Sequence, residues 1–125
     1  MKSFLSVVLV GVVFVLLYDS IGALISRSTG FAYGWLAIGS LALYAVFGFL
    51  AGRKSGWAYG LAGGAFLGLI DSTIGWTISW MIGPGKPSTE MNAVMILVTV
   101  IFVTISAGVF GLIGGLTSLL GKRDA

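Results

Sequence analysis

The sequence predicts an all-α integral membrane protein, a four-helix bundle made of two tandem helical hairpins in parallel repeat. Three observations lead to this fold class. Charged residues make up 9% of the chain and hydrophobic residues 58%, the mean hydropathy is +1.08, and the apolar residues fall into long runs separated by short polar segments. A soluble domain carries about 25% charged residues. This chain lacks that polar surface, so we expect residues 1–125 to form a single membrane domain.

Each apolar run is long enough to cross a bilayer, which takes about 20 residues for roughly 30 Å of hydrocarbon. The first run contains one acid, Asp19, the second contains no charge, and the third contains only Asp71. The fourth is the longest, so we expect it to tilt, to kink near residues 108–115, or to project from the bilayer. The predicted spans cover residues 3–26, 31–51, 57–82 and 91–120.

Short connections join these spans at residues 27–30, 52–56 and 83–90. The last contains Pro84 and Pro87, which cannot continue a helix. Because the connections are short, successive spans must run antiparallel. The first span contains Asp19 and lacks a clean small-residue cleavage site before Arg27. We therefore expect this span to be retained and not removed as a signal peptide.

The basic residues indicate an orientation. Arg27 and Lys86 lie on one side of the predicted bundle, and five lie on the other: Lys2, Arg53, Lys54, Lys122 and Arg123. Because cytoplasmic loops carry an excess of Lys and Arg, this bias predicts that both termini face the cytoplasm. The same distribution favours an orientation signal over a nucleic-acid-binding surface.

Several kinds of chemistry are excluded by composition. Cysteine and histidine are both absent, which removes disulfides, thiol nucleophiles, His–Cys metal sites and imidazole acid–base catalysis. The chain also has no phosphate-binding loop and no pairing of a nucleophile with a base. We therefore expect a protein that is not an enzyme and that holds neither cofactor nor metal.

Two aspartates lie deep in apolar runs, at matching places in the two halves of the chain. Asp19 and Asp71 each follow a phenylalanine by five positions and precede a serine. An ionised side chain in hydrocarbon is costly, so an intramembrane acid is a functional hypothesis by default. If the two carboxyls lie close together, they cannot both ionise readily, and one would hold a proton that a cation could displace.

The alternative role of these acids is structural, because a buried carboxyl can tie helices together at about 0.6–2 kcal/mol per polar contact. Neighbouring polar side chains would serve either role, and Trp76 would also offer its ring face to an organic cation. The candidate proton, cation or interhelical polar site consists of Asp19, Asp71, Tyr18, Ser20, Ser72, Thr73 and Trp76.

The match around the aspartates extends into an internal repeat. Residues 19–26 align with residues 71–79 after a one-residue insertion, and residues 47–52 resemble residues 110–115. Two hairpins inserted in the same direction form a parallel repeat whose axis follows the membrane normal. This arrangement would bring the two aspartates together near the outer leaflet. The alternative is coincidence, because apolar helices use a small set of residues.

Small residues recur at four-residue spacing on several predicted helices. Where a side chain is missing, two helix backbones can approach closely, and the resulting contacts drive association inside a bilayer. These faces predict either packing within one chain or a homo-oligomer. The candidate packing residues are Gly48, Gly52, Gly60, Gly64, Gly68, Gly111 and Gly115.

The central hairpin carries a family resemblance. The segments Gly-Phe-Leu-Ala-Gly-Arg-Lys at residues 48–54 and Tyr-Gly-Leu-Ala-Gly-Gly-Ala-Phe-Leu-Gly at residues 59–68 resemble a group of uncharacterised small four-helix bacterial membrane proteins. The resemblance implies the same architecture and a bacterial plasma (inner) membrane. It implies no activity, because the group has none assigned.

Two functions remain open. The first is a non-catalytic accessory or packing subunit, which contacts the lipid bilayer and assembles with itself or with a larger membrane complex. The glycine faces and short loops favour it. The alternative is a small oligomeric transporter or channel that uses Asp71 and Asp19 for a proton or cation, and a holin-like pore is a weaker member of this class. The sequence favours the accessory subunit, which needs fewer assumptions.

Overall fold

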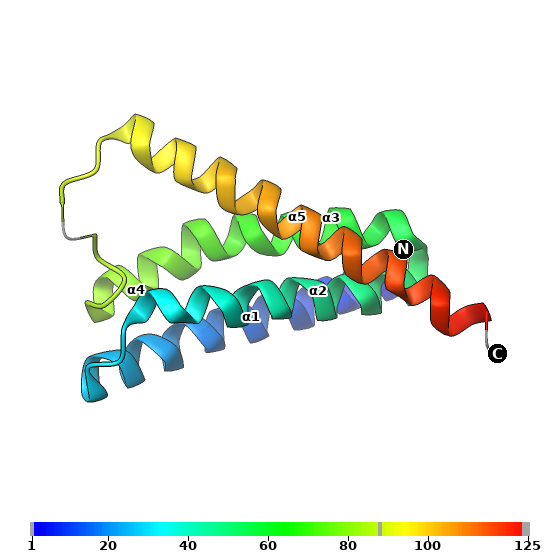
Figure 1. Cartoon of the computed structure of the whole chain (residues 1–125), viewed down its shortest axis with the longest axis horizontal. Helices are drawn as coiled ribbons and strands as arrows, with labels where there is room; N and C mark the ends of the chain where they lie inside the picture. The colour runs from blue at the N-terminus through cyan, green and yellow to red at the C-terminus, as the bar shows by residue number, and fades with distance from the viewer. Residues whose placement is uncertain (1, 88, 124–125) are drawn as a thin grey trace.

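The computed structural model describes residues 2–87 and 89–123 as helices joined by short turns, with no strand in these ranges (Figure 1). The predicted all-α four-helix bundle is confirmed, and its four spans are long and apolar enough to cross a membrane. The elements are α1 (Lys2–Thr29), the 3₁₀ turn η1 (Tyr33–Trp35), α2 (Leu36–Ser55), α3 (Trp57–Ile70), the π-helical turn η2 (Asp71–Gly75), α4 (Trp76–Ile82) and α5 (Ala93–Arg123).

The helix ends differ from the predicted spans by a few residues. α1 continues to Thr29, beyond the predicted end at residue 26. α5 begins at Ala93, where Oδ1 of Asn92 accepts a hydrogen bond of 2.9 Å from the Met95 N–H and so satisfies one free donor of the first turn. α5 is one uninterrupted α-helix, and the irregular turn lies instead in the third span, at η2.

A glycine with positive φ lies in each of the three connections: Gly30 (76°), Gly56 (116°) and Gly83 (127°). A left-handed backbone is readily adopted only by glycine, and at helix ends it turns the chain while capping the last carbonyls. The Gly83 N–H, for example, donates to the Ser79 carbonyl at 2.9 Å. These turns give the antiparallel order expected from the short connections.

α5 packs against α2 and α3 through small residues, and the backbones come close enough to exclude any side chain. A Cβ added at Gly48 would lie 2.6 Å from Cα of Gly111, and one added at Gly64 would lie 2.7 Å from the same atom. We call this region, where α5 lies against both helices, the glycine contact. All the candidate packing glycines lie in it: Gly48, Gly52, Gly60, Gly64, Gly68, Gly111 and Gly115.

Some of these contacts join residues that the predicted repeat makes equivalent. Gly48 lies against Gly111, and Gly52 lies against Gly115. In the described part of the chain, however, the backbones of α1 and α5 do not come close to each other, whereas those of α2 and α3 do. The packing therefore does not follow a two-fold axis throughout, and the duplication stays a prediction.

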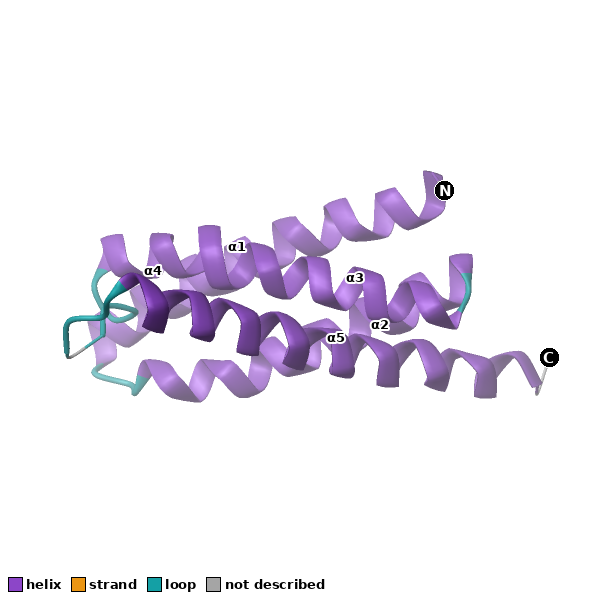
Figure 2. Ribbon diagram, turned by 90° about the horizontal axis from the view of Figure 1, so that it is seen from above, coloured by secondary structure: helices purple, strands orange, loops and turns teal. Residues whose placement is uncertain are grey.

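Beyond the glycine contact, α2 and α5 separate. The start of α5 (yellow) lies well away from the start of α2 (cyan) in Figure 1, and the bundle is seen from above in Figure 2. α1 closes on α2 at the same end, where the Tyr18 side chain lies over Gly39 and its hydroxyl donates to the Leu36 carbonyl at 2.6 Å. The buried apolar core consists of Val7, Val15, Tyr44, Phe47, Ala51, Leu67 and Ala107.

Candidate functional site

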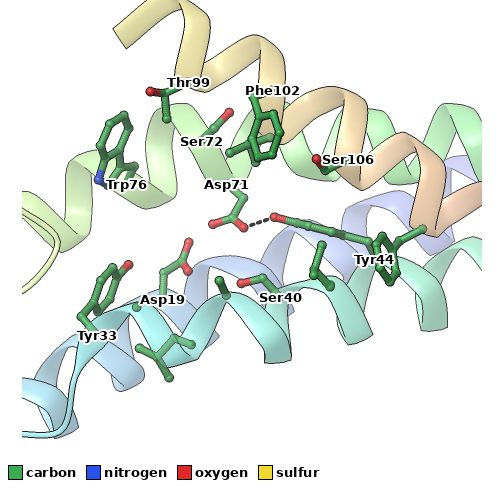
Figure 3. Close-up of a pocket in the computed structure, with 16 residues that line it drawn as sticks. Asp19, Tyr33, Ser40, Tyr44, Asp71, Ser72, Trp76, Thr99, Phe102 and Ser106 are labelled. Atoms are coloured by element: carbon green, nitrogen blue, oxygen red, sulfur yellow. Dashed lines mark hydrogen bonds between the residues drawn. The ribbon is translucent and has the colours of Figure 1, made fainter. Parts of the chain in front are cut away.

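The carboxyl groups of Asp19 and Asp71 meet over the backbone of Gly75 (Figure 3). Asp19 comes from α1 and is only 4% exposed, and Asp71 is the first residue of η2. The carboxyl oxygens of the two side chains approach each other over Gly75. A Cβ added at Gly75 would collide with Oδ2 of Asp19 and would lie 3.1 Å from Oδ1 of Asp71. Glycine at this position therefore leaves the space that the acid pair occupies.

The π-helical turn η2 sets the direction in which the side chains of the third span point near Asp71. It covers Asp71–Gly75, between two regular α-helical segments. Single π turns inside α-helices occur frequently at functional sites. The Ser72 hydroxyl donates to the Gly68 carbonyl at 2.8 Å, and the Thr73 hydroxyl donates to the Leu69 carbonyl at 2.6 Å. Both hydroxyls therefore bond within their own span and not to the carboxyls.

Tyr44 of α2 is a third member of the site, and the sequence analysis missed it. Its hydroxyl donates a hydrogen bond to Oδ2 of Asp71, and the side chain is 2% exposed. A signal was present, because a tyrosine in the middle of an uncharged span needs a partner for its hydroxyl when it is buried. The only acids within the predicted spans were Asp19 and Asp71.

One buried carboxyl oxygen of the pair has no hydrogen-bond partner among the described residues. Oδ2 of Asp19 is buried and accepts no hydrogen bond from any described residue. Two ionised carboxylates at this separation would repel each other strongly in a low-dielectric setting. One proton held by the pair, or one bound cation, would relieve this repulsion.

The pair lies on the wall of a cavity of about 390 Å³ between α1, α2, η2 and α5. Hydrogen bonds hold its aromatic walls. The hydroxyls of Tyr33 and Ser79 hydrogen-bond to each other, and the Trp76 indole N–H donates to the Gly85 carbonyl at 2.9 Å. The remaining wall is mainly apolar. The lining side chains drawn and labelled in Figure 3 are Asp19, Tyr33, Ser40, Tyr44, Asp71, Ser72, Trp76, Thr99, Phe102 and Ser106.

The other predicted ligands lie elsewhere. Tyr18, Ser20 and Thr73 are not part of this cavity wall. The Ser20 hydroxyl donates to the Leu16 carbonyl of its own helix at 2.8 Å, as Tyr18 and Thr73 also donate to backbone carbonyls. Of the polar neighbours that the sequence singled out, the structure brings only Ser72 and Trp76 to the acid pair.

The site does not have the composition of a metal centre. Within the described residues, no group of three or more His, Cys, Asp or Glu side chains lies together. The pair offers carboxyl oxygens from two residues, and a hard divalent cation such as Ca²⁺ takes about six to eight oxygen ligands. The chemistry that these groups support directly is the binding and release of a proton, or of a singly charged cation.

Comparisons with protein families, with curated proteins and with solved structures give no match to this chain. The resemblance of the central hairpin to small bacterial membrane proteins therefore stays a prediction. Any functional conclusion must come from the geometry of the site.

Proposed function

We propose that this protein is a small membrane transporter that exchanges a proton for a singly charged cation at Asp19 and Asp71. One observation carries the proposal. Oδ2 of Asp19 is buried without a partner, faces the Asp71 carboxyl, and belongs to a residue on the wall of an open cavity. A purely structural acid would be expected to have its oxygens satisfied, because an unpaired buried polar atom costs about 1–3 kcal/mol.

The exchange follows from charge balance. With one proton, the pair carries a single negative charge and the two carboxyls hydrogen-bond to each other. A cation that enters the cavity between them replaces that proton, so the charge of the site is unchanged. Because the two states compete for the same oxygens, binding of one releases the other, which is the basic requirement for coupled exchange.

The accessory subunit remains the second candidate, and its support is weaker with the fold in hand. The candidate packing glycines contact helices of the same chain, so they do not by themselves call for a partner protein. The separation of α5 from α2, on the other hand, leaves a cavity that internal packing alone does not require. We therefore place transport first.

The location of the protein is part of the proposal. Five of the seven basic residues lie on one side of the predicted bundle, which supports cytoplasmic termini by the positive-inside rule. The central hairpin's resemblance supports a bacterial plasma membrane. In this orientation the connection between α4 and α5 faces outward, and the cavity opens in the outer half of the bilayer.

The test uses the full chain reconstituted in liposomes that contain a pH-sensitive dye. Proton movement is recorded while Na⁺, K⁺ or an organic ammonium ion is added outside. We expect cation-driven proton movement in the natural protein and its loss in Asp19→Asn and Asp71→Asn. Ser20→Ala is the matched control, because Ser20 neighbours Asp19 but bonds within its own helix.

Assembly is measured on the same preparations by native mass spectrometry. If the asparagine variants lose their oligomeric state or detergent stability, while the natural protein moves no protons with any of these cations, the acids are structural and the accessory role replaces transport. A stable complex with a second protein in gently extracted membranes would point the same way.

A further inference from the structure

The cavity has a shape that the sequence did not predict. α2 and α5 touch at the glycine contact, for example at Gly48 and Gly111, and separate toward η1 and the start of α5. The space between them is lined by α2 from Leu36 to Tyr44 and by α5 from Thr99 to Phe110. We call this space the α2–α5 cleft. The acid pair lies on its inner wall, contributed by α1 and η2 (Figure 3).

The size of the cleft argues against a bare inorganic ion as its main occupant. A volume of about 390 Å³ lies in the range of roughly 300–1,000 Å³ that is typical of sites for drug-sized organic molecules. A proton or an alkali ion would leave nearly all of it empty, and a mainly apolar wall offers few oxygens to replace a hydration shell. An occupant that fills the cleft needs an apolar body as well as a charge.

The aromatic walls suit such a body. Tyr44 is held by its hydrogen bond to Asp71, Tyr33 by Ser79 and Trp76 by the Gly85 carbonyl. Aromatic faces attract organic cations, by about 0.5–2 kcal/mol for each well-placed ring. Because these rings are already fixed, little side-chain entropy is lost when a ligand binds.

The cleft also opens sideways. Ala37 on α2 is exposed, and Phe102 on α5 is 69% exposed, although both line the cleft. Both belong to predicted membrane spans, so the outward side of this opening meets lipid. A molecule with an apolar body is concentrated in the bilayer by the hydrophobic effect and can reach the opening without first crossing an aqueous vestibule.

We infer that the α2–α5 cleft binds an organic cation with an apolar body, which enters from the bilayer and places its charge between Asp19 and Asp71. This inference rests on the proposed exchange of a proton for a cation and names the class of cation. The carboxyl groups of Asp19 and Asp71 select for positive charge. The tyrosine, tryptophan and phenylalanine side chains of the cleft contact the apolar body.

The test compares three probe ions that differ in the sign of their charge and in whether they have a large apolar part. Tetraphenylphosphonium, tetraphenylborate and tetramethylammonium are titrated into the full chain in lipid nanodiscs, and binding is followed by tryptophan fluorescence and by equilibrium dialysis. We expect tetraphenylphosphonium to bind more weakly as the pH falls. Tetraphenylborate has the same apolar body with the opposite charge, and tetramethylammonium has the charge without that body. Once binding to empty nanodiscs is subtracted, both should bind the protein far more weakly.

Variants of the acid pair and of the cleft opening test where tetraphenylphosphonium binds. Asp19→Asn and Asp71→Asn should weaken tetraphenylphosphonium binding about thirtyfold or more, as expected when one member of a desolvated charge pair is removed. Ala37→Phe should block the cleft opening and abolish binding, while the acid pair still titrates by its infrared carboxyl band. Ala42→Phe is the matched control, since Ala42 is also exposed on α2 but does not line the cleft.

The outcomes separate this inference from the proposed function. If Na⁺ or K⁺ displaces the proton of the pair and tetraphenylphosphonium does not, exchange stands and the organic ligand is wrong. If no cation displaces the proton, the proposed function fails and the inference fails with it. Equal binding in Ala37→Phe and Ala42→Phe, or in the asparagine variants, would place the probe in the lipid or on another surface and overturn the site.

Discussion

The hydroxyl of Tyr44 donates a hydrogen bond to Oδ2 of Asp71, which joins the middle of α2 to the irregular turn of the third span. Tyr44 also belongs to the buried apolar core. The same side chain therefore packs the bundle and orients one carboxyl of the acid pair. The polar site is built into the core and is not an addition at the surface.

Tyr44→Phe tests this link. The substitution keeps the ring and leaves Oδ2 of Asp71 without its donor, which should destabilise the protein by about 1–3 kcal/mol. Unfolding by titration with sodium dodecyl sulfate, followed by circular dichroism, measures the change. Tyr59→Phe is the control, because Tyr59 is exposed and packs edge-on against Phe4 at 4.9 Å. Equal stability of the two variants would contradict the role given to Tyr44.

Gly75→Ala tests whether the carboxyl groups of Asp19 and Asp71 meet over Gly75. Alanine usually stabilises a helix relative to glycine, by about 0.5–1 kcal/mol. At this position its Cβ would collide with Oδ2 of Asp19, so we expect a loss of stability and a changed infrared carboxyl band instead. Gly34→Ala is the matched control, since a Cβ there meets nothing within 4 Å. A stabilised Gly75→Ala protein with an unchanged band would rule out this geometry.

Gly111→Ala tests the glycine contact. Its Cβ would lie 2.7 Å from Cα of Gly64, and because backbone atoms cannot move aside cheaply, we expect destabilisation of about 1–3 kcal/mol. At Gly108 the nearest atom is Cδ1 of Leu61 at 3.2 Å, which can shift, so Gly108→Ala should be milder. If Gly111→Ala instead dissociates an oligomer and leaves the free energy of unfolding of the single chain unchanged, the glycines serve association between chains.

The orientation can be tested because the chain contains no cysteine. A single cysteine at Lys54→Cys would lie at the end of α2, and one at Lys86→Cys would lie between α4 and α5. In intact cells, a membrane-impermeant maleimide should label Lys86→Cys and spare Lys54→Cys. Labelling of both variants until saturation would indicate insertion in both directions, and the reverse pattern would place the termini outside.

The parts of the site that sequence reasoning reached are those with a local signal. Asp19 and Asp71 stand out because an acid in an apolar run is costly wherever the chain folds. Tyr18, Ser20 and Thr73 neighbour the acids in sequence, but their hydroxyls bond to backbone carbonyls and not to the carboxyls. Tyr44 and Tyr33 were missed because each lies far along the chain from the acid pair.

The sequence by itself determined that this chain forms four apolar helices with short turns, because the length and hydropathy of each run suffice to predict a membrane span. It also determined that two acids lie within those spans. Only the tertiary structure decided which side chains surround the acids and that a cleft lies beside them. Those features depend on how closely α5 approaches α2 and α3 at their glycines, on where α2 and α5 then separate, and on the π turn Asp71–Gly75. Such distances are set by packing between segments remote in sequence, and no local pattern encodes them.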